Sequence, residues 1–302
     1  MLEAGLIISR FLHFAAATAL FGASLYPLYT YHVGAEDQPA QLSRWLASTL
    51  AVAAFATLIS SLLWLAFVTA NMNDALSAAV DPAALASVIH DTGFGRLWIV
   101  RLALNALIVV FAVAQLFFAK GRQQRLLMPL LAAALLASLS GTGHTQTAEH
   151  MGRYLHTASD AAHLLGAGTW LCGLLALAFT LGQTSTDAEA ILRRFSGMGY
   201  IAVAVLIGSG LVNSWFLVGS IPALFTTPYG QLLAIKLFLV AGMLGFAALN
   251  RFWLVPSLTR TAEGHDFALA QLRRHVLGEQ ALGILVLVIV SMIGTMQPAT
   301  AV

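Results

Sequence analysis

Histidine side chains gather toward one face of the apolar segments in this chain. Six of the nine histidines lie at or just inside that face, namely His13, His90, His144, His150, His156 and His163. Because an imidazole is costly to place near hydrocarbon, intramembrane histidines generally belong to binding sites or transport pathways. Imidazole nitrogens ligate copper, zinc and iron. The pattern therefore predicts a metal or cofactor entrance on that face.

The densest group of metal-ligating side chains lies on one apolar segment. His156, Asp160 and His163 fall within about 60° of one another at 100° per residue, so they share one helical face. Counted from the ends of their segments at that face, His163 lies roughly 10 Å deep and His13 roughly 12 Å deep. We predict that these two imidazoles bind one ion, with Asp160 as a third ligand or as the acceptor that orients a histidine. The alternative is that the histidines only hydrogen-bond to the backbone or to Ser159 inside the bundle.

Other candidate ligands lie in loops or near helix ends. His144 and His150 flank a connection whose glycines let a short loop fold over the bundle mouth, which suits the capture of an ion. Met292 and Met296 are one helical turn apart and offer thioethers, which suit Cu(I). His90 lies in an acidic loop. A loop histidine is usually solvated, and a methionine in an apolar helix usually packs against other apolar side chains. His90, Met292 and Met296 are therefore secondary candidates.

Three intramembrane charges lie near the same face: Arg10, Arg101 and Lys236. Each side chain can snorkel to the membrane surface, or one of them pairs with Asp160. Asn213 adds a donor and an acceptor at similar depth. The opposite half of the bundle is poor in ligands, with Glu279 and Gln280 as its main polar pair. A transporter with this asymmetry would need to move or to hand its ion over.

The composition places all of these residues in a membrane protein. The chain has 302 residues, of which 59% are apolar and 9% are charged, whereas soluble domains carry about 25% charged residues. Continuous Leu-, Ala- and Val-rich stretches approach the roughly 20 helical residues that cross a bilayer core. We predict an all-α, polytopic transmembrane bundle with eight helices at about 5–31, 43–70, 96–118, 126–143, 156–182, 197–219, 229–254 and 276–296.

Lysine and arginine residues predict the orientation, because they concentrate in cytoplasmic loops. The connections after the third, fifth and seventh predicted helices contain Lys120, Arg122, Arg125, Arg193, Arg194, Arg251, Arg260, Arg273 and Arg274. Both termini and the six clustered histidines should therefore lie on the periplasmic side. The first segment carries Glu3 and no basic n-region, so we expect a retained helix rather than a signal peptide.

We expect one membrane domain over residues 1–302. A polar stretch near residues 182–189 predicts a weak division into two four-helix halves, about 1–183 and 190–302. The single cysteine, Cys172, excludes an intramolecular disulfide and a C-x-x-C motif. H-E-x-x-H, G-x-S-x-G and P-loop motifs and a basic block are absent from the sequence, so we expect neither an enzyme nor a nucleic-acid-binding protein.

The C-terminal half carries a combination of motifs typical of one family. It contains Asn213-Ser-Trp215, Tyr229-Gly230, Lys236 and Asn250-Arg251. These segments resemble the bacterial copper resistance D (CopD/PcoD) family. The first half is consistent with this resemblance in Arg10-Phe-Leu-His13, Gly-Thr-Gly-His144 and His163-Leu-Leu-Gly-Ala-Gly-Thr-Trp170.

The resemblance implies a multi-pass inner-membrane protein, embedded in lipid, that serves copper homeostasis or resistance and takes up copper from the periplasm. It also implies a periplasmic copper-binding partner of the CopC type. It supplies no ligand set, so the predicted site for Cu(I) or Cu(II) rests on the histidine pattern. Two alternatives stay open. One is an electron-transfer protein with His13 and His163 as axial ligands of a b-type haem, and the other is a copper sensor or assembly factor that does not transport.

The distribution of basic residues gives a direct test of the orientation. A reporter fused after Val302 should behave as periplasmic, and one inserted near Arg122 should behave as cytoplasmic. Paired alkaline phosphatase and fluorescent-protein fusions measure this. The opposite pattern would place the six histidines on the cytoplasmic side.

Overall fold

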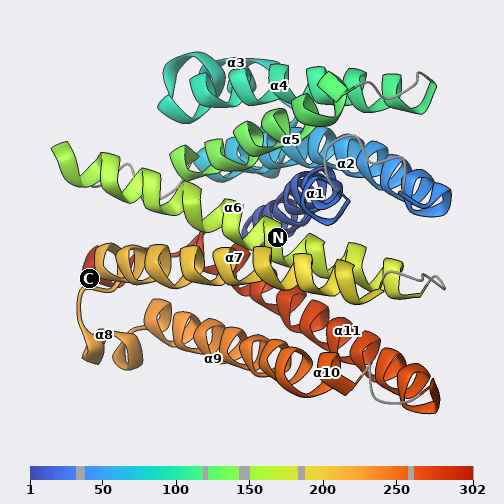
Figure 1. The fold of residues 1–302 in the computed structure, drawn as a ribbon. Helices are drawn as coiled ribbons and strands as arrows, with labels where there is room; N and C mark the ends of the chain where they lie inside the picture. Colours follow the sequence, from blue (N-terminus) through green and yellow to red (C-terminus); the bar gives the residue numbers. More distant parts are fainter. Residues whose placement is uncertain (32–37, 118–121, 143–149, 183–187, 258–261, 302) are drawn as a thin grey trace.

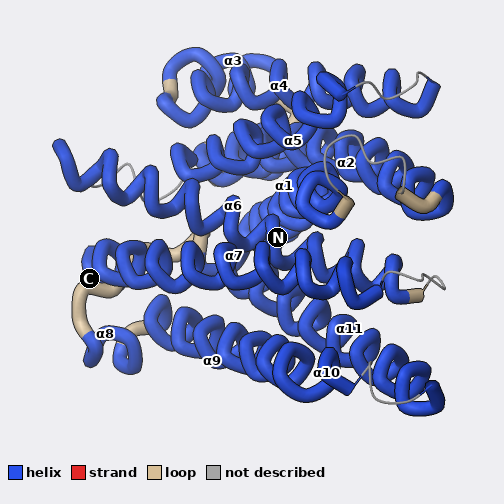
Figure 2. The backbone as a smooth tube through the Cα atoms, viewed as in Figure 1, coloured by secondary structure: helices blue, strands red, loops and turns tan. Residues whose placement is uncertain are grey.

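The computed structural model describes residues 1–31, 38–117, 122–142, 150–182, 188–257 and 262–301, with the side chains of residues 122–125, 150, 188–189, 262–266 and 301 left aside. Within these ranges every regular element is a helix (Figures 1 and 2). The long helices are α1 (Leu2–Thr30), α2 (Ala40–Met72), α4 (Gly93–Phe117), α6 (His150–Leu181), α7 (Ala188–Leu217), α9 (Pro228–Leu249) and α11 (Ala262–Ile293).

Seven helices in the described part of the chain are long and apolar enough to cross a membrane. The fourth predicted span is a shorter apolar helix, in which α5 (Arg122–Ala137) continues into the 3-10 helix η2 (Ser138–Thr142). The predicted all-α membrane bundle is therefore confirmed. Residues 1–183 contribute α1, α2, α4, α5 and α6, and the later residues contribute α7, α9 and α11. A division near residue 183 thus separates five helices from three, rather than four from four.

The connections contain short helices that begin at well-defined caps. Asp81 accepts hydrogen bonds from the backbone of Ala83 and Ala84 at the start of α3 (Pro82–Asp91), which follows η1 (Leu76–Ala79). Ser220 and Thr227 cap α8 (Ile221–Thr226) and α9 in the same way, each with a proline in the first helical turn. A side-chain cap satisfies backbone donors that have no partner inside the helix. Gly219, at a φ of 72°, makes the turn between α7 and α8.

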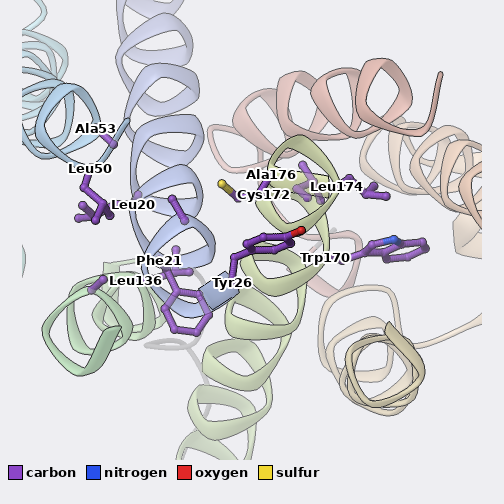
Figure 3. Close-up of a cluster of buried hydrophobic side chains, with 14 of the residues drawn as sticks. Leu20, Phe21, Tyr26, Leu50, Ala53, Leu136, Trp170, Cys172, Leu174 and Ala176 are labelled. Atoms are coloured by element: carbon purple, nitrogen blue, oxygen red, sulfur yellow. The ribbon is translucent and has the colours of Figure 1, made fainter. Parts of the chain in front are cut away.

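The core forms around α1, which packs against α2, α5, α6 and α11 (Figure 1). The Cys172 thiol donates to the Ala19 carbonyl at 3.2 Å, and the hydroxyls of Tyr26 and Thr180 lie 3.0 Å apart. Figure 3 shows Cys172 and Tyr26 between α1 and α6. These contacts fix the register of the two helices. Cys172 is buried and packs in this interface, in agreement with the absence of a redox motif.

The helices differ in how much of their surface the bundle covers. Of the most apolar stretch of α6, 72% is buried, compared with 11% for α7 and 6% for the helix that begins with α9. Helix α6 is therefore part of the packed core, whereas α7 and α9 lie at the periphery and present most of their apolar side chains to lipid.

Close approach of α1 and α6 depends on Gly22. A Cβ at this position would meet the Cys172 side chain and the Gly168 carbonyl oxygen, and the latter belongs to backbone that cannot easily move. Gly22→Ala should therefore lower the free energy of unfolding by roughly 1–3 kcal/mol. Thermal unfolding of the purified protein in detergent measures this loss.

Gly208→Ala on α7 is the matched control, because a Cβ there meets no atom within 4 Å. Alanine is the better helix former by about 1 kcal/mol, so this variant should be neutral or slightly more stable. Equal unfolding temperatures for the two variants would show that α1 and α6 do not need Gly22 for their contact.

Candidate metal site

Polar side chains of α6 meet side chains of α7 and α9 within the predicted periplasmic half of the bundle. The His163 Nδ1 lies 3.0 Å from Ser209 Oγ on α7, and its Nε2 lies 3.5 Å from Lys236 Nζ on α9. Asp160 Oδ1 accepts a hydrogen bond from Asn213 Nδ2 at 3.3 Å. Lys236 is also close enough to Asp160 to interact with it electrostatically. This arrangement favours a pairing of Lys236 with Asp160 over simple snorkelling.

The hydrogen bonds of Ser209 determine which nitrogen of His163 carries the proton. The Ser209 hydroxyl donates to the Val205 carbonyl at 2.5 Å, so its oxygen is free to accept from His163 Nδ1–H. In this tautomer the lone pair lies on Nε2. Histidines that bind metals are commonly held in this way through the other ring nitrogen. His163 is thus oriented as a ligand whose lone pair faces Lys236.

Asn213 provides a further acceptor next to this cluster. Its side chain is almost fully buried, and among the described residues its Oδ1 has no hydrogen-bond partner, although its Nδ2 donates to Asp160. A buried carbonyl oxygen without a partner costs free energy, so such atoms are rare. The donor atoms that this cluster offers are Nε2 of His163, the Asp160 carboxylate oxygens and the Asn213 oxygen. By ligand type this set suits Cu(II) or zinc better than Cu(I).

His156 lies one helical turn from Asp160 toward the predicted periplasmic end of α6. Its ring is buried and stacks on Phe216 of α7, with centroids 4.7 Å apart and planes 7° from parallel. The predicted polar face of α6 therefore turns toward α7 along its length, from His156 to His163.

His13 is the centre of a second polar cluster, formed by α1, α2 and α4. The side chain is fully buried, and its Nδ1 lies 3.0 Å from Ser60 Oγ and 3.3 Å from Ser61 Oγ. Its Nε2 lies 2.6 Å from Arg101 Nη2. Because a guanidinium only donates, Nε2 is the acceptor and Nδ1 carries the proton. Asn105 extends this cluster by donating to Ser61 Oγ at 3.1 Å.

Arg101 does not snorkel to the membrane surface. It is buried, and its Nη1 donates to the Leu135 carbonyl at 2.8 Å and to Ser138 Oγ. Its guanidinium also lies 5.0 Å from the centroid of the Trp98 ring. Arg10 lies nearby over the Trp64 ring at 4.7 Å. Two guanidinium groups therefore surround the tryptophan and histidine rings of this cluster.

Ala19 lies opposite Cys172, so counting residues back along the two helices puts His163 opposite Arg10, three positions from His13. The shared depth of the two histidines stays a prediction. Each imidazole nevertheless has its own partners. The described residues contain no group of three or more His, Cys, Asp or Glu side chains placed to hold one metal ion. Binding of one ion by both histidines stays a prediction.

The remaining predicted ligands lie apart from these clusters. His90 is exposed on α3. Met292 is exposed on α11, which ends at Ile293, so Met296 lies in the following turn and packs against a small apolar cluster rather than continuing the helix. His144 falls outside the described residues, and His150 is described only as the first residue of α6.

Sequence reasoning missed the serines that orient both histidines. Ser60 and Ser61 are adjacent polar residues in an otherwise apolar helix, and Ser209 lies four residues before Asn213 on one face of α7. Two consecutive serines in an apolar stretch, and two polar residues four apart on one helical face, are the signals that would have found them.

Residues 1–154 match the family model described as Copper resistance protein D-like, N-terminal domain, and residues 189–293 match Copper resistance protein D. The chain belongs to the copper resistance protein D family. It is 31% identical to Inner membrane protein YebZ of Escherichia coli, over 97% of this chain and 98% of that protein. It is also 31% identical to Copper resistance protein D of Pseudomonas syringae pv. tomato, over 97% of this chain and 96% of that protein.

Copper transport protein CutJ of Bacillus subtilis is 27% identical over 95% of this chain, which spans 52% of that longer protein. No solved structure matches the chain. The resemblance read from the C-terminal motifs is confirmed for nearly the whole chain. The copper resistance protein D relatives and the apolar helices identify a multi-pass inner-membrane protein of copper handling. Asp160 and His163 lie between the two segments that the family models match.

The contacts of Lys236 predict a dependence on Asp160. Lys236→Met should lower the free energy of unfolding by roughly 1–3 kcal/mol, because it leaves the Asp160 carboxylate without its counter-charge inside the bundle. Asp160→Asn in the same chain should restore part of this loss, since the unpaired carboxylate is what costs free energy.

Lys236→Arg is the matched control because it keeps the charge and the reach of the side chain. Unfolding temperatures of the single and double variants complete the cycle. Additive effects of Lys236→Met and Asp160→Asn would mean that the two side chains do not interact.

Proposed function

We propose that this protein carries copper across the inner membrane from the periplasm, through a binding site formed by His163 and Asp160. The observation that carries the proposal is the arrangement of His163, whose Nε2 lone pair faces a lysine side chain at 3.5 Å beside a carboxylate. Membership of the copper resistance protein D family supports copper as the ion.

In this proposal Lys236 serves as the cation of the site before a copper ion enters. Its ammonium group balances the Asp160 carboxylate and faces the lone pair of His163. A copper ion that enters replaces one cation by another, so the carboxylate is never left without a counter-charge inside the membrane. The lysine side chain is flexible and is held at His163 by a single long contact, so it can withdraw.

His13 is a less favourable ligand in this proposal. Its Nε2 is engaged by Arg101, which is itself fixed by Leu135, Ser138 and the Trp98 ring. An ion at Nε2 would have to displace a buried guanidinium from all of these partners, and Arg10 would add repulsion. We assign His13 to the polar core that positions α1, α2 and α4. The alternative, in which His13 is a second ligand of the same copper ion, is tested below.

Ions reach the site from the periplasmic end of α6. His156, one turn from Asp160, is the next polar side chain in that direction, and His144 and His150 are proposed to capture copper at the mouth. In this scheme a periplasmic copper-binding protein of the CopC type delivers the ion, and His90 and the Met292 and Met296 pair serve at most as peripheral ligands. Removal of a capture residue would slow uptake without changing the affinity of the site.

His163→Ala and Asp160→Asn should each remove one bound copper ion per chain and abolish copper uptake into proteoliposomes. His90→Ala is the control, since this exposed side chain lies away from the cluster. Elemental analysis of the purified protein and uptake of copper into vesicles are the measurements. Unchanged copper binding and uptake by His163→Ala would refute the site.

His13→Ala separates a single-histidine site from a joint one. Retention of the copper ion supports the proposal made here, whereas its loss together with that of His163→Ala would show that both imidazoles bind one ion. An absorption spectrum of the purified protein tests the haem alternative, because a bis-histidine b-type haem has a strong Soret band. Copper binding without vesicle uptake would favour a sensor or assembly factor.

A further inference from the structure

A third buried polar cluster lies toward the opposite end of the bundle. Asn250, at the end of α9, donates from Nδ2 to Glu279 Oε1 on α11 at 2.7 Å. Its Oδ1 lies 2.8 Å from His275 Nδ1, one turn away on α11. Trp170 of α6 also hydrogen-bonds to Glu279. Figure 3 shows Trp170 pointing from α6 away from α1. The cluster therefore joins α6, α9 and α11.

This cluster is separate from the one around His163. Lys236 and Asn250 are fourteen residues apart along α9 and its continuation, which corresponds to roughly 21 Å at 1.5 Å per residue. The sequence indicates few ligands in this half, with Glu279 and Gln280 as its main polar pair. The structure adds His275 and Asn250 to Glu279 as side chains that meet within the bundle.

The Asn250 amide lies between His275 Nδ1 and Glu279 Oε1. Asn250 Oδ1 is an acceptor, so His275 Nδ1 carries the proton and donates it. Nδ1 becomes a metal ligand when this proton moves to Nε2, the other tautomer of the neutral imidazole. Phe246 packs against the ring at a centroid distance of 5.3 Å and restricts its orientation.

His275 and Glu279 are four residues apart on α11, so their side chains are neighbours on one face. The Asn250 amide bridges them and keeps them together without a direct bond between the imidazole and the carboxylate. Rotation of this amide would open a position between His275 Nδ1 and Glu279 Oε1 and could turn the Asn250 oxygen toward it. A set of imidazole, carboxylate and amide donors suits Cu(II) or a similar divalent transition metal.

Two further observations point to a cation rather than to a hydrogen-bonded contact alone. Glu279 is only 2% exposed, yet among the described residues its hydrogen-bond partners are the neutral Asn250 and Trp170, and no ion pair involves it. Asn250 also begins the π-helical turn η4 (Asn250–Leu254), before α10 (Val255–Ser257). Single π-helical turns inside α-helices occur frequently at functional sites.

We propose that His275, Glu279 and Asn250 form a second metal-binding site, which accepts a divalent copper ion after it leaves the site at His163 and before it reaches the other face of the membrane. The order of the two sites rests on the proposed function, whereas the existence of the second site does not.

Titration of the purified protein with Cu(II) tests this site. The wild-type chain should bind two Cu(II) ions. Glu279→Gln should keep one of them and bind the other with at least tenfold weaker affinity, so that only one ion is bound at concentrations that saturate the wild-type chain. Glutamine keeps the shape and the acceptor oxygen of the side chain but loses its charge. Gln280→Asn on the adjacent position is the matched control and should still bind two ions. His275→Asn is the second variant, for use if Glu279→Gln does not fold.

The variants at the two sites give distinguishable results. Loss of one ion in Glu279→Gln and of the other in His163→Ala, with none bound by the double variant, supports two separate sites. If His163→Ala still binds two ions and Glu279→Gln binds one, the proposed function fails while the second site stands. Two ions bound by folded Glu279→Gln and His275→Asn proteins would overturn the second site and leave the cluster as a hydrogen-bonded contact between helices.

Discussion

The packing of α6 against α1 is the contact on which the rest of the structure depends. It is made by small residues and by two hydrogen bonds, from Cys172 to the Ala19 carbonyl and between Tyr26 and Thr180. Small residues allow helices to approach closely in lipid, where apolar area alone gives little preference for one partner over another. Because α6 carries Asp160, His163 and Trp170, its register on α1 sets the level of both polar clusters proposed to bind copper.

Both intramembrane histidines follow the same local rule. A serine accepts from Nδ1, and a basic side chain faces Nε2, with Arg101 at His13 and Lys236 at His163. In hydrocarbon each polar group needs a hydrogen-bond partner within the protein. The serine and the basic side chain therefore offset the free energy lost when the imidazole leaves water. The two clusters differ in how firmly the cation is held. Arg101 has several partners, whereas Lys236 has few, and this difference separates a structural histidine from a candidate ligand.

The sequence predicted the features that depend on one helix at a time. The helical fold, the approximate spans and the shared face of His156, Asp160 and His163 follow from hydropathy and from the helical period. Contacts between helices were harder to predict from the sequence. The pairing of His13 with Arg101 and that of His275 with Asn250 depend on the register and rotation of neighbouring helices, which one sequence does not specify. Met296 shows the same limit, because the helix ends before it at Ile293.

The uneven burial of the helices would affect the thermodynamics of ion binding at the proposed site. His163 lies on the densely packed α6, whereas Asn213 and Lys236 lie on α7 and α9, of which only 11% and 6% of the apolar stretches are covered. An ion held between these helices would tie two loosely packed elements to a rigid one. Part of the interaction energy would then be spent in restricting the conformational freedom of α7 and α9. The apparent affinity would therefore depend on the surrounding lipid, since the lipid sets how freely the peripheral helices move before the ion arrives.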